Sequence, residues 1–205
     1  MSWHQGQTAI FVDPDPLACA VFIITAFIGA GALHTLWLRS RFSVRFMIPL
    51  DGYRTFRGKR IFGDNKTFRG FMVMVPAVGA VFLVLGLLHT ILPAWLSRGV
   101  WPLSPSSYVL LGLWAGFGFM AGELPNSFLK RQLGIPPGAA PAHGWAKPLC
   151  FLLDRLDSIA GMMLALSWVV PIPLQTWGYV LVIGPGVHWS FSVVMFLLLV
   201  KARPA

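Results

Sequence analysis

The chain has few acidic side chains. Asp and Glu account for 7 of its 205 residues, against 16 Lys and Arg, and charged residues make up only 11% of a chain that is 56% hydrophobic. Five of the seven carboxylates nevertheless cluster beside Lys and Arg in two polar stretches, namely Asp51, Asp64, Glu123, Asp154 and Asp157. Carboxylates gathered among cations predict a site for a divalent metal ion and a polyphosphate.

Cysteine and histidine are too scattered to build common alternatives to such a site. The two cysteines, Cys19 and Cys150, are too few for a disulfide framework. No His and Cys residues recur at the spacing of zinc ligands. The histidines in or near the apolar segments are predicted to be packing or interface residues, and no Ser or Cys nucleophile stands beside a base. Magnesium, which prefers hard oxygen ligands, is therefore the predicted metal.

Long apolar runs predict an all-α, polytopic membrane protein. The mean hydropathy is +0.70, and a transmembrane helix needs about 20 mostly apolar residues. Five segments meet this condition, and together they predict a single integral membrane domain over residues 1–205. The predicted spans are 17–38, 71–92, 106–122, 158–174 and 178–200.

The placement of basic residues predicts the orientation in the membrane. Residues 1–16 hold no Lys or Arg, whereas 39–69 hold nine. By the positive-inside rule the N-terminus is outside, and the polar stretches 39–70 and 122–158 and the C-terminus are cytoplasmic. The predicted location is the cell's inner membrane. The net charge of +9 fits membrane lipids as partners, and because the cations lie in short connections it argues against nucleic acid.

The stretch 39–70 has the composition of an anion-binding loop. Its glycines at 52, 58 and 63 let backbone N–H groups approach a ligand. Arg and Lys add charge-assisted donors. The spacing of a nucleotide-binding P-loop is missing. A solvated connector between spans is the alternative for this stretch taken alone.

The stretch 122–158 supplies both cations and carboxylates. Lys130 and Arg131 precede Pro136, which ends their helix. If the next helix begins near Leu152, Asp154 and Asp157 share one face at i, i+3 and lie in its first turns, where the helix dipole stabilises carboxylates. A single Asp there is an N-cap; two, with Glu123 at the end of the preceding span, favour a metal site.

The lack of a protein nucleophile is itself informative. A phosphate monoester is mostly dianionic near neutral pH, since its second pKa is about 6. It can attack another phosphorus atom without a strong base, provided that metal, Lys and Arg align the groups and neutralise charge.

Three motifs in order resemble the CDP-archaeol synthase family, which is related to the phosphatidate cytidylyltransferases. They are Gly63-Asp64-Asn65-Lys66-Thr67-Phe68-Arg69-Gly70, Ser127-Phe128-Leu129-Lys130-Arg131 and Leu153-Asp154-Arg155-Leu156-Asp157. The resemblance implies transfer of CMP from CTP to a lipid phosphate, giving a CDP-activated lipid and pyrophosphate with Mg²⁺. The family often has Asp at the position of Glu123 and a small residue at that of Asn126.

The resemblance also implies roles for individual residues. Asp154 and Asp157, with Glu123, would hold the metal. Lys130 and Arg131 would act with them as catalytic residues by binding phosphates. The CTP pocket would be shaped by Asp64, Asn65, Lys66, Thr67, Arg69 and Ser127.

Several alternatives stay open at this point. The acceptor could be an ether-linked isoprenoid lipid, a diacyl lipid or another lipid phosphate, and the choice of CTP over other nucleotides rests on the resemblance. A transferase that consumes CDP-lipids would need a denser run of aspartates. A non-enzymatic transporter, channel subunit or anionic-lipid-binding protein would need polar residues within its spans. The sequence does not decide between a monomer and a homodimer, although such membrane enzymes are often dimers.

Overall fold

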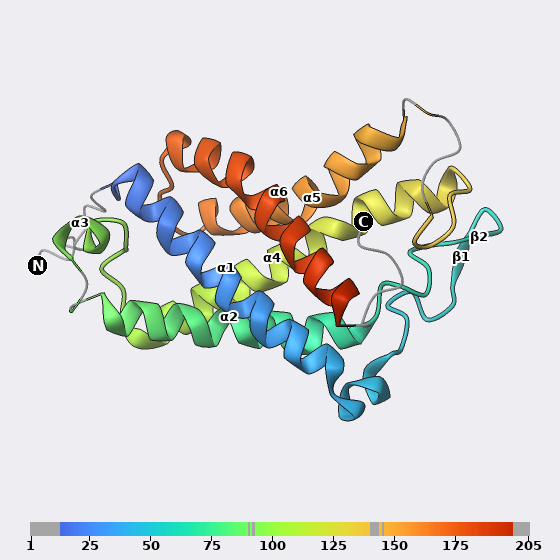
Figure 1. The fold of residues 1–205 in the computed structure, drawn as a ribbon, viewed down its shortest axis with the longest axis horizontal. Coiled ribbons are helices and arrows are strands. Elements are labelled where there is room, and N and C mark those ends of the chain that lie inside the picture. The colour runs from blue at the N-terminus through green and yellow to red at the C-terminus, as the bar shows by residue number, and fades with distance from the viewer. Residues whose placement is uncertain (1–12, 90, 92, 140–143, 145, 199–205) are drawn as a thin grey trace, which may run out of the picture.

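The computed structural model describes residues 13–89, 91, 93–139, 144 and 146–198. Five long helices dominate it, which confirms the predicted all-α polytopic class (Figure 1). They are α1 (Pro16–Arg39), α2 (Phe68–Leu88), α4 (Pro105–Gln132), α5 (Ala146–Ser167) and α6 (Leu174–Leu197). The short elements are η1 (Arg41–Phe46), α3 (Ala94–Ser97), β1 (Thr55–Phe56) and β2 (Lys59–Arg60), the last two forming an antiparallel pair.

Four of the helices, α1, α2, α4 and α6, are long and apolar enough to cross a membrane. Local sequence explains where two of them begin. The Asp15 side chain accepts a hydrogen bond from the N–H of Ala18 at 2.9 Å, and Ser104 accepts one from Ser107 at 3.2 Å. Each cap is followed by a proline at the start of the helix, where no N–H is needed.

The bounds predicted for the fourth span, 158–174, are wrong. Helix α5 begins at Ala146, includes most of the polar end of the predicted connector, and stops at Ser167. Likewise α4 continues to Gln132 and so carries Glu123 and Lys130 within a helix. Lys130 and Arg131 were expected to lie on a helix that Pro136 ends, and the structure places that helix in continuity with the third span. The polar residues of both helices line a cavity.

Glycines let α4 and α5 pack backbone against backbone. A Cβ added to Gly122 would lie 2.4 Å from the carbonyl oxygen of Asp157, and one added to Gly161 would lie 2.3 Å from that of Gly118. Small residues at such crossings are typical of membrane helix pairs. The close approach fixes Glu123 of α4 beside Asp154 and Asp157 of α5.

The two predicted polar stretches meet at one end of the bundle. Figure 1 shows η1, β1, β2, the end of α4 and the start of α5 at the same end, opposite α3. The contact is direct, because Lys59 Nζ donates to the carbonyl oxygen of Gln132 at 2.6 Å. Residues 1–12, His143, Lys201 and Arg203 lie outside the described part of the chain.

Candidate active site

A cavity of about 1020 Å³ opens between α1, α2, α4, α5 and α6 at the end where the polar stretches meet. Every residue predicted for the site lines it, so residues far apart in the sequence are brought together. These are Asp64, Asn65, Lys66, Thr67, Arg69, Glu123, Ser127, Lys130, Arg131, Asp154 and Asp157. The cavity continues between the helices past apolar side chains such as Phe27, Met74 and Phe191.

The loop before α2 is organised around Asp51, whose side chain is buried. Its carboxylate accepts hydrogen bonds from the N–H groups of Tyr53 at 3.1 Å and of Phe62 and Gly63 at 3.0 Å, and from Arg60 Nη2 at 2.7 Å. Burial by itself raises the pKa of Asp51, but these hydrogen bonds outweigh it and hold the pKa well below its usual range. Asp51 thus shapes the loop that follows.

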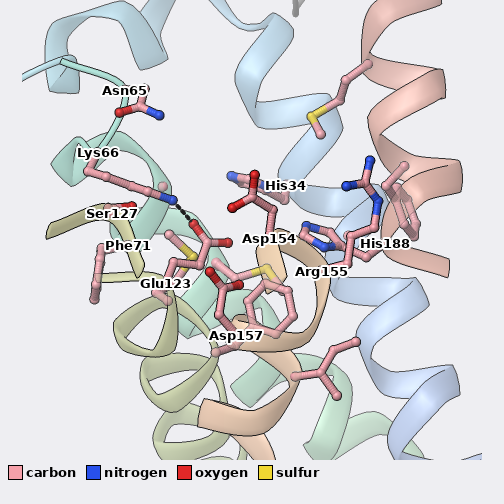
Figure 2. Close-up of a pocket in the computed structure, with 18 of the residues that line it drawn as sticks. His34, Asn65, Lys66, Phe71, Glu123, Ser127, Asp154, Arg155, Asp157 and His188 are labelled. Atoms are coloured by element: carbon pink, nitrogen blue, oxygen red, sulfur yellow. Dashed lines mark hydrogen bonds and ion pairs between the residues drawn. The ribbon is translucent and has the colours of Figure 1, made fainter. Parts of the chain in front are cut away.

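That loop delivers Lys66 to the acidic residues of the helices. Lys66 Nζ pairs with Glu123 Oε2, as the dashed line in Figure 2 marks. The other Glu123 oxygen accepts a hydrogen bond from Ser158 Oγ at 2.8 Å. Burial disfavours the ammonium of Lys66, but the charges of Glu123, Asp157 and Asp154 prevail and raise its pKa. Lys66 is therefore a fixed cation.

Asp154 and Asp157 face the same way, as their i, i+3 spacing predicts. The Asn126 amide nitrogen donates to Asp154 Oδ1 at 2.7 Å and to Asp157 Oδ2 at 2.8 Å. Lys130 Nζ pairs with Asp154 Oδ1. One amide therefore joins two carboxylates that have a lysine beside them.

The expected position of these carboxylates in their helix is wrong. Helix α5 starts at Ala146, more than two turns before Asp154. Neither Asp154 nor Asp157 is an N-cap, and the dipole of the helix terminus, which falls off within the first turn, does not account for them. Their charge is balanced by cations of the cavity instead.

The cations differ in how far they are already engaged. Arg131 is only 8% exposed, and its Nε and Nη1 have no hydrogen-bond partner in the described part of the chain. Arg69 lines the cavity but is already engaged, since its guanidinium donates to Ser43 Oγ at 2.9 Å and to the carbonyl oxygen of Leu38. Asp64 pairs with Arg60 at 2.8 Å and is largely exposed.

No ready-made metal cage is present among residues 13–89, 91, 93–139, 144 and 146–198, in that no three His, Cys, Asp or Glu side chains converge as a metal-binding group. The donor set is a carboxylate pair, Asp154 and Asp157. Glu123 lies nearby, with its oxygens on Lys66 and Ser158.

Sequence reasoning missed three residues that line the same cavity: His34 on α1, Arg155 on α5 and His188 on α6. Figure 2 shows Arg155 and His188 across Asp154 from Lys66, with His34 next to Asp154 in the view. The histidines were predicted to be packing or interface residues. The signal that could have found the two histidines is an ionisable side chain inside an otherwise apolar span.

The helices and the cavity define a multi-pass membrane protein that encloses carboxylates and cations at one end of its bundle. Residues 42–204 match the CarS-like family described as CDP-archaeol synthase. The chain therefore belongs to this family, as its motifs indicate.

Curated relatives agree with this assignment. A CDP-archaeol synthase of Thermococcus gammatolerans is 34% identical over 160 residues, covering 76% of this chain and 81% of the relative. The CDP-archaeol synthase of Methanopyrus kandleri is 33% identical over 165 residues, covering 76% and 79%. That of Pyrococcus furiosus is 31% identical over 162 residues, covering 76% and 83%. No solved structure matches the chain.

Proposed function

We propose that this protein is a CTP-dependent cytidylyltransferase that transfers CMP from CTP to a lipid phosphate, forming a CDP-activated lipid and pyrophosphate. Its family and the names of its relatives support this activity. The observation that carries the proposal is the cavity itself. One continuous space is lined by the carboxylates of Asp154 and Asp157, by cations that include Lys66, Lys130 and Arg131, and by apolar side chains that extend it between the helices.

The cations suit the triphosphate of CTP. Arg131 is buried, and its Nε and Nη1 have no hydrogen-bond partner among the described residues. A guanidinium can bind two phosphate oxygens at once. Lys66 and Lys130 are held at the cavity by carboxylates, so a phosphate can replace those partners without moving the ammonium groups far. Asn65, Thr67 and Ser127 add neutral donors on the same wall.

The carboxylates suit Mg²⁺. This ion usually takes one or two protein carboxylates and completes its octahedron with waters and substrate phosphates. Asp154 and Asp157, both bonded to the Asn126 amide, offer such a pair, and Glu123 stays a predicted third ligand. When bound, the ion would neutralise charge on the triphosphate.

The chemistry needs no base from the protein. An oxygen of the lipid phosphate forms a bond to the α-phosphorus of CTP, while the bond from that phosphorus to the bridging oxygen breaks and pyrophosphate leaves. The task of the chain is to align the two anions and to offset their repulsion. Lys66, Lys130 and Arg131 would stabilise the departing pyrophosphate.

The proposed orientation places this site on the cytoplasmic side of the inner membrane. The support is the charge of the stretch 39–69, whose nine Lys and Arg contrast with the single Arg98 of the connection 93–105. CTP would enter from the cytoplasm through the loop end of the cavity.

The test is direct synthesis. The purified protein in nanodiscs is incubated with CTP labelled at the α-phosphate, Mg²⁺, and either a diacylglycerol phosphate or a dialkylglycerol phosphate. We expect label to appear in a CDP-lipid and to be lost when EDTA removes the metal. A folded sample that labels neither acceptor would contradict the proposal.

A further inference from the structure

We propose that Arg155, His34 and His188 form a second anion subsite, which holds the phosphate of the lipid acceptor. The inference rests on the proposed function and names the wall of the cavity where its second substrate binds. The ligand class is a phosphomonoester carried on apolar chains. None of the three residues belongs to the set predicted for CTP.

The position of these residues separates them from the CTP wall. In Figure 2, Lys66 and Ser127 lie on one side of Glu123 and Asp157, Arg155 and His188 lie on the other, and His34 is seen next to Asp154. The carboxylates thus have cationic or ionisable groups on both sides. Two anionic substrates can then bind on opposite sides of the carboxylates, each contacting its own set of cationic or ionisable side chains.

Arg155 is held in place and keeps donor capacity. It is 7% exposed, its Nη1 donates to the carbonyl oxygen of Phe151 at 2.7 Å, and its guanidinium carbon lies 3.3 Å from the centre of the Phe151 ring. Its Nε has no hydrogen-bond partner, and it forms no ion pair, within the part of the chain that the structure describes. A buried cation without an anion is costly unless a ligand supplies one.

The histidines lie on helix faces that are mostly apolar. On α6, His188 is flanked at helical spacing by Gly184 and Phe191, and all three line the cavity. On α1, His34 follows Phe27 and Gly31 on the lining face. Each helix therefore places one ionisable side chain beside a row of apolar side chains, called the apolar track below.

This pairing of a polar contact with an apolar track matches a lipid phosphate better than a nucleotide. Hydrocarbon chains lying along α1 and α6 would place the head phosphate beside His34 and His188, where the positive charge of Arg155 attracts it. His188 is already oriented by an edge-to-face contact with Phe119, whose ring centre is 6.0 Å away. A free nucleotide gains nothing from the apolar track.

The experiment separates the two substrates. His34→Gln and His188→Gln variants of the full chain, in nanodiscs, are assayed with the dialkylglycerol and diacylglycerol phosphates at varied lipid fraction and varied CTP. We expect each variant to raise the KM for the lipid phosphate about tenfold, the effect of one lost hydrogen bond to a charged group, with the KM for CTP unchanged. Arg155→Lys should act in the same direction.

The matched control is His89→Gln. His89 ends α2 at the far end of the bundle, where its ring contacts the carbonyl oxygen of Gly86. Its variant should leave both KM values unchanged. Binding of water-soluble dihexanoylglycerol phosphate, measured by calorimetry without CTP, gives a readout that does not need turnover. It should weaken in the His34, His188 and Arg155 variants but not in the His89 variant.

The outcomes distinguish this proposal from the one it rests on. An unchanged lipid KM in both histidine variants overturns the subsite, and so does a rise confined to the KM for CTP, which would assign these residues to the nucleotide. A wild-type protein that binds dihexanoylglycerol phosphate through His34 and His188 but makes no CDP-lipid would instead refute the proposed reaction.

Discussion

The two ends of the helix bundle bury polar side chains against different partners. At the aromatic end, made of Phe22, Trp101, Tyr108 and Pro171, the Trp101 indole donates to the carbonyl oxygen of Pro171 at 2.9 Å and the Tyr108 hydroxyl donates to that of Trp101. At the charged end, made of Lys66, Glu123, Lys130, Asp154 and Asp157, Lys66 pairs with Glu123 and Lys130 pairs with Asp154.

The difference separates a stabilising arrangement from one that is built for a ligand. Neutral hydrogen bonds under an aromatic cluster contribute to stability at little desolvation cost. The two ion pairs at the charged end are partly buried. Ion pairs removed from water often lose as much in desolvation as they gain from attraction, so their presence in a largely apolar chain is better explained by what they bind. Substitutions at the two ends should therefore affect different observables.

The largest effect is expected from Asp157→Asn. The change keeps the shape of the side chain but removes the charge that a metal ion needs, so kcat should fall at least about a hundredfold, while the protein elutes and unfolds like the wild type. Labelled CDP-lipid formation is the measurement.

The matched control for that change is Asp15→Asn at the other end, where Asn also caps a helix. It should leave kcat unchanged. Full turnover by the Asp157 variant would exclude this carboxylate as an essential ligand.

The next effect in size is expected from Gly122→Ala. The added Cβ would meet the carbonyl oxygen of Asp157 at 2.4 Å, so α4 and α5 must separate, at a cost of about 1–3 kcal/mol. Both the thermal unfolding midpoint in detergent and the turnover should drop. Gly186→Ala on α6, where a Cβ meets nothing within 4 Å, should change neither. Equal behaviour of the two variants would refute the close-packing account.

A smaller effect is expected from Asp51→Asn. The variant loses charge-assisted bonds to Arg60 and to loop amides, so the KM for CTP should rise about tenfold with kcat less affected. Steady-state kinetics at varied CTP measure it. A rise in the lipid KM alone would show that Asp51 does not organise a nucleotide loop.

The same carboxylate makes a pH prediction. The pKa of Asp51 is lower in the folded protein than in the unfolded chain. The contribution of its carboxylate to the stability of the folded protein is therefore complete above the ordinary aspartate pKa of about 4, and it is lost as the pH falls through the lower folded pKa. Hydrogen exchange at the amides of Phe62 and Gly63, corrected for intrinsic rates, should show steady protection from pH 7 to about 4 and loss only below it. Loss of protection between pH 7 and 5 would contradict this.

The smallest effect is expected from Trp101→Phe at the aromatic end. It removes one hydrogen bond, to Pro171, and should lower the free energy of unfolding by about 1 kcal/mol. Catalysis should stay at the wild-type level. A loss of turnover without a loss of stability would mean that the two ends are not separate in function.

Sequence patterns predicted those parts of the site that depend on local spacing. Asp154 and Asp157 at i, i+3 lie on one face, and the motif around Lys66 reaches the same cavity as Lys130 and Arg131. The shared face of Asp154 and Asp157 follows from helix geometry. The meeting of the two polar stretches follows from the two apolar helices, α2 and α4, that connect them.

The rest depends on tertiary contacts that no local pattern reveals. The role of Asp51 needs amides up to twelve residues away, and the start of α5 at Ala146 is hidden because polar residues of a cavity wall look like a connector. His34 and His188 look like packing residues, since periodicity shows that a helix is buried but not that one face borders a cavity.

The most direct test of the central claim is a Mg²⁺ titration of CTP binding to the wild type and to the Lys66→Gln and Asp154→Asn variants. If the loop cations and the α5 carboxylates form one site, binding will require the metal and will be lost in both variants. Metal-independent binding that survives both substitutions would contradict the account.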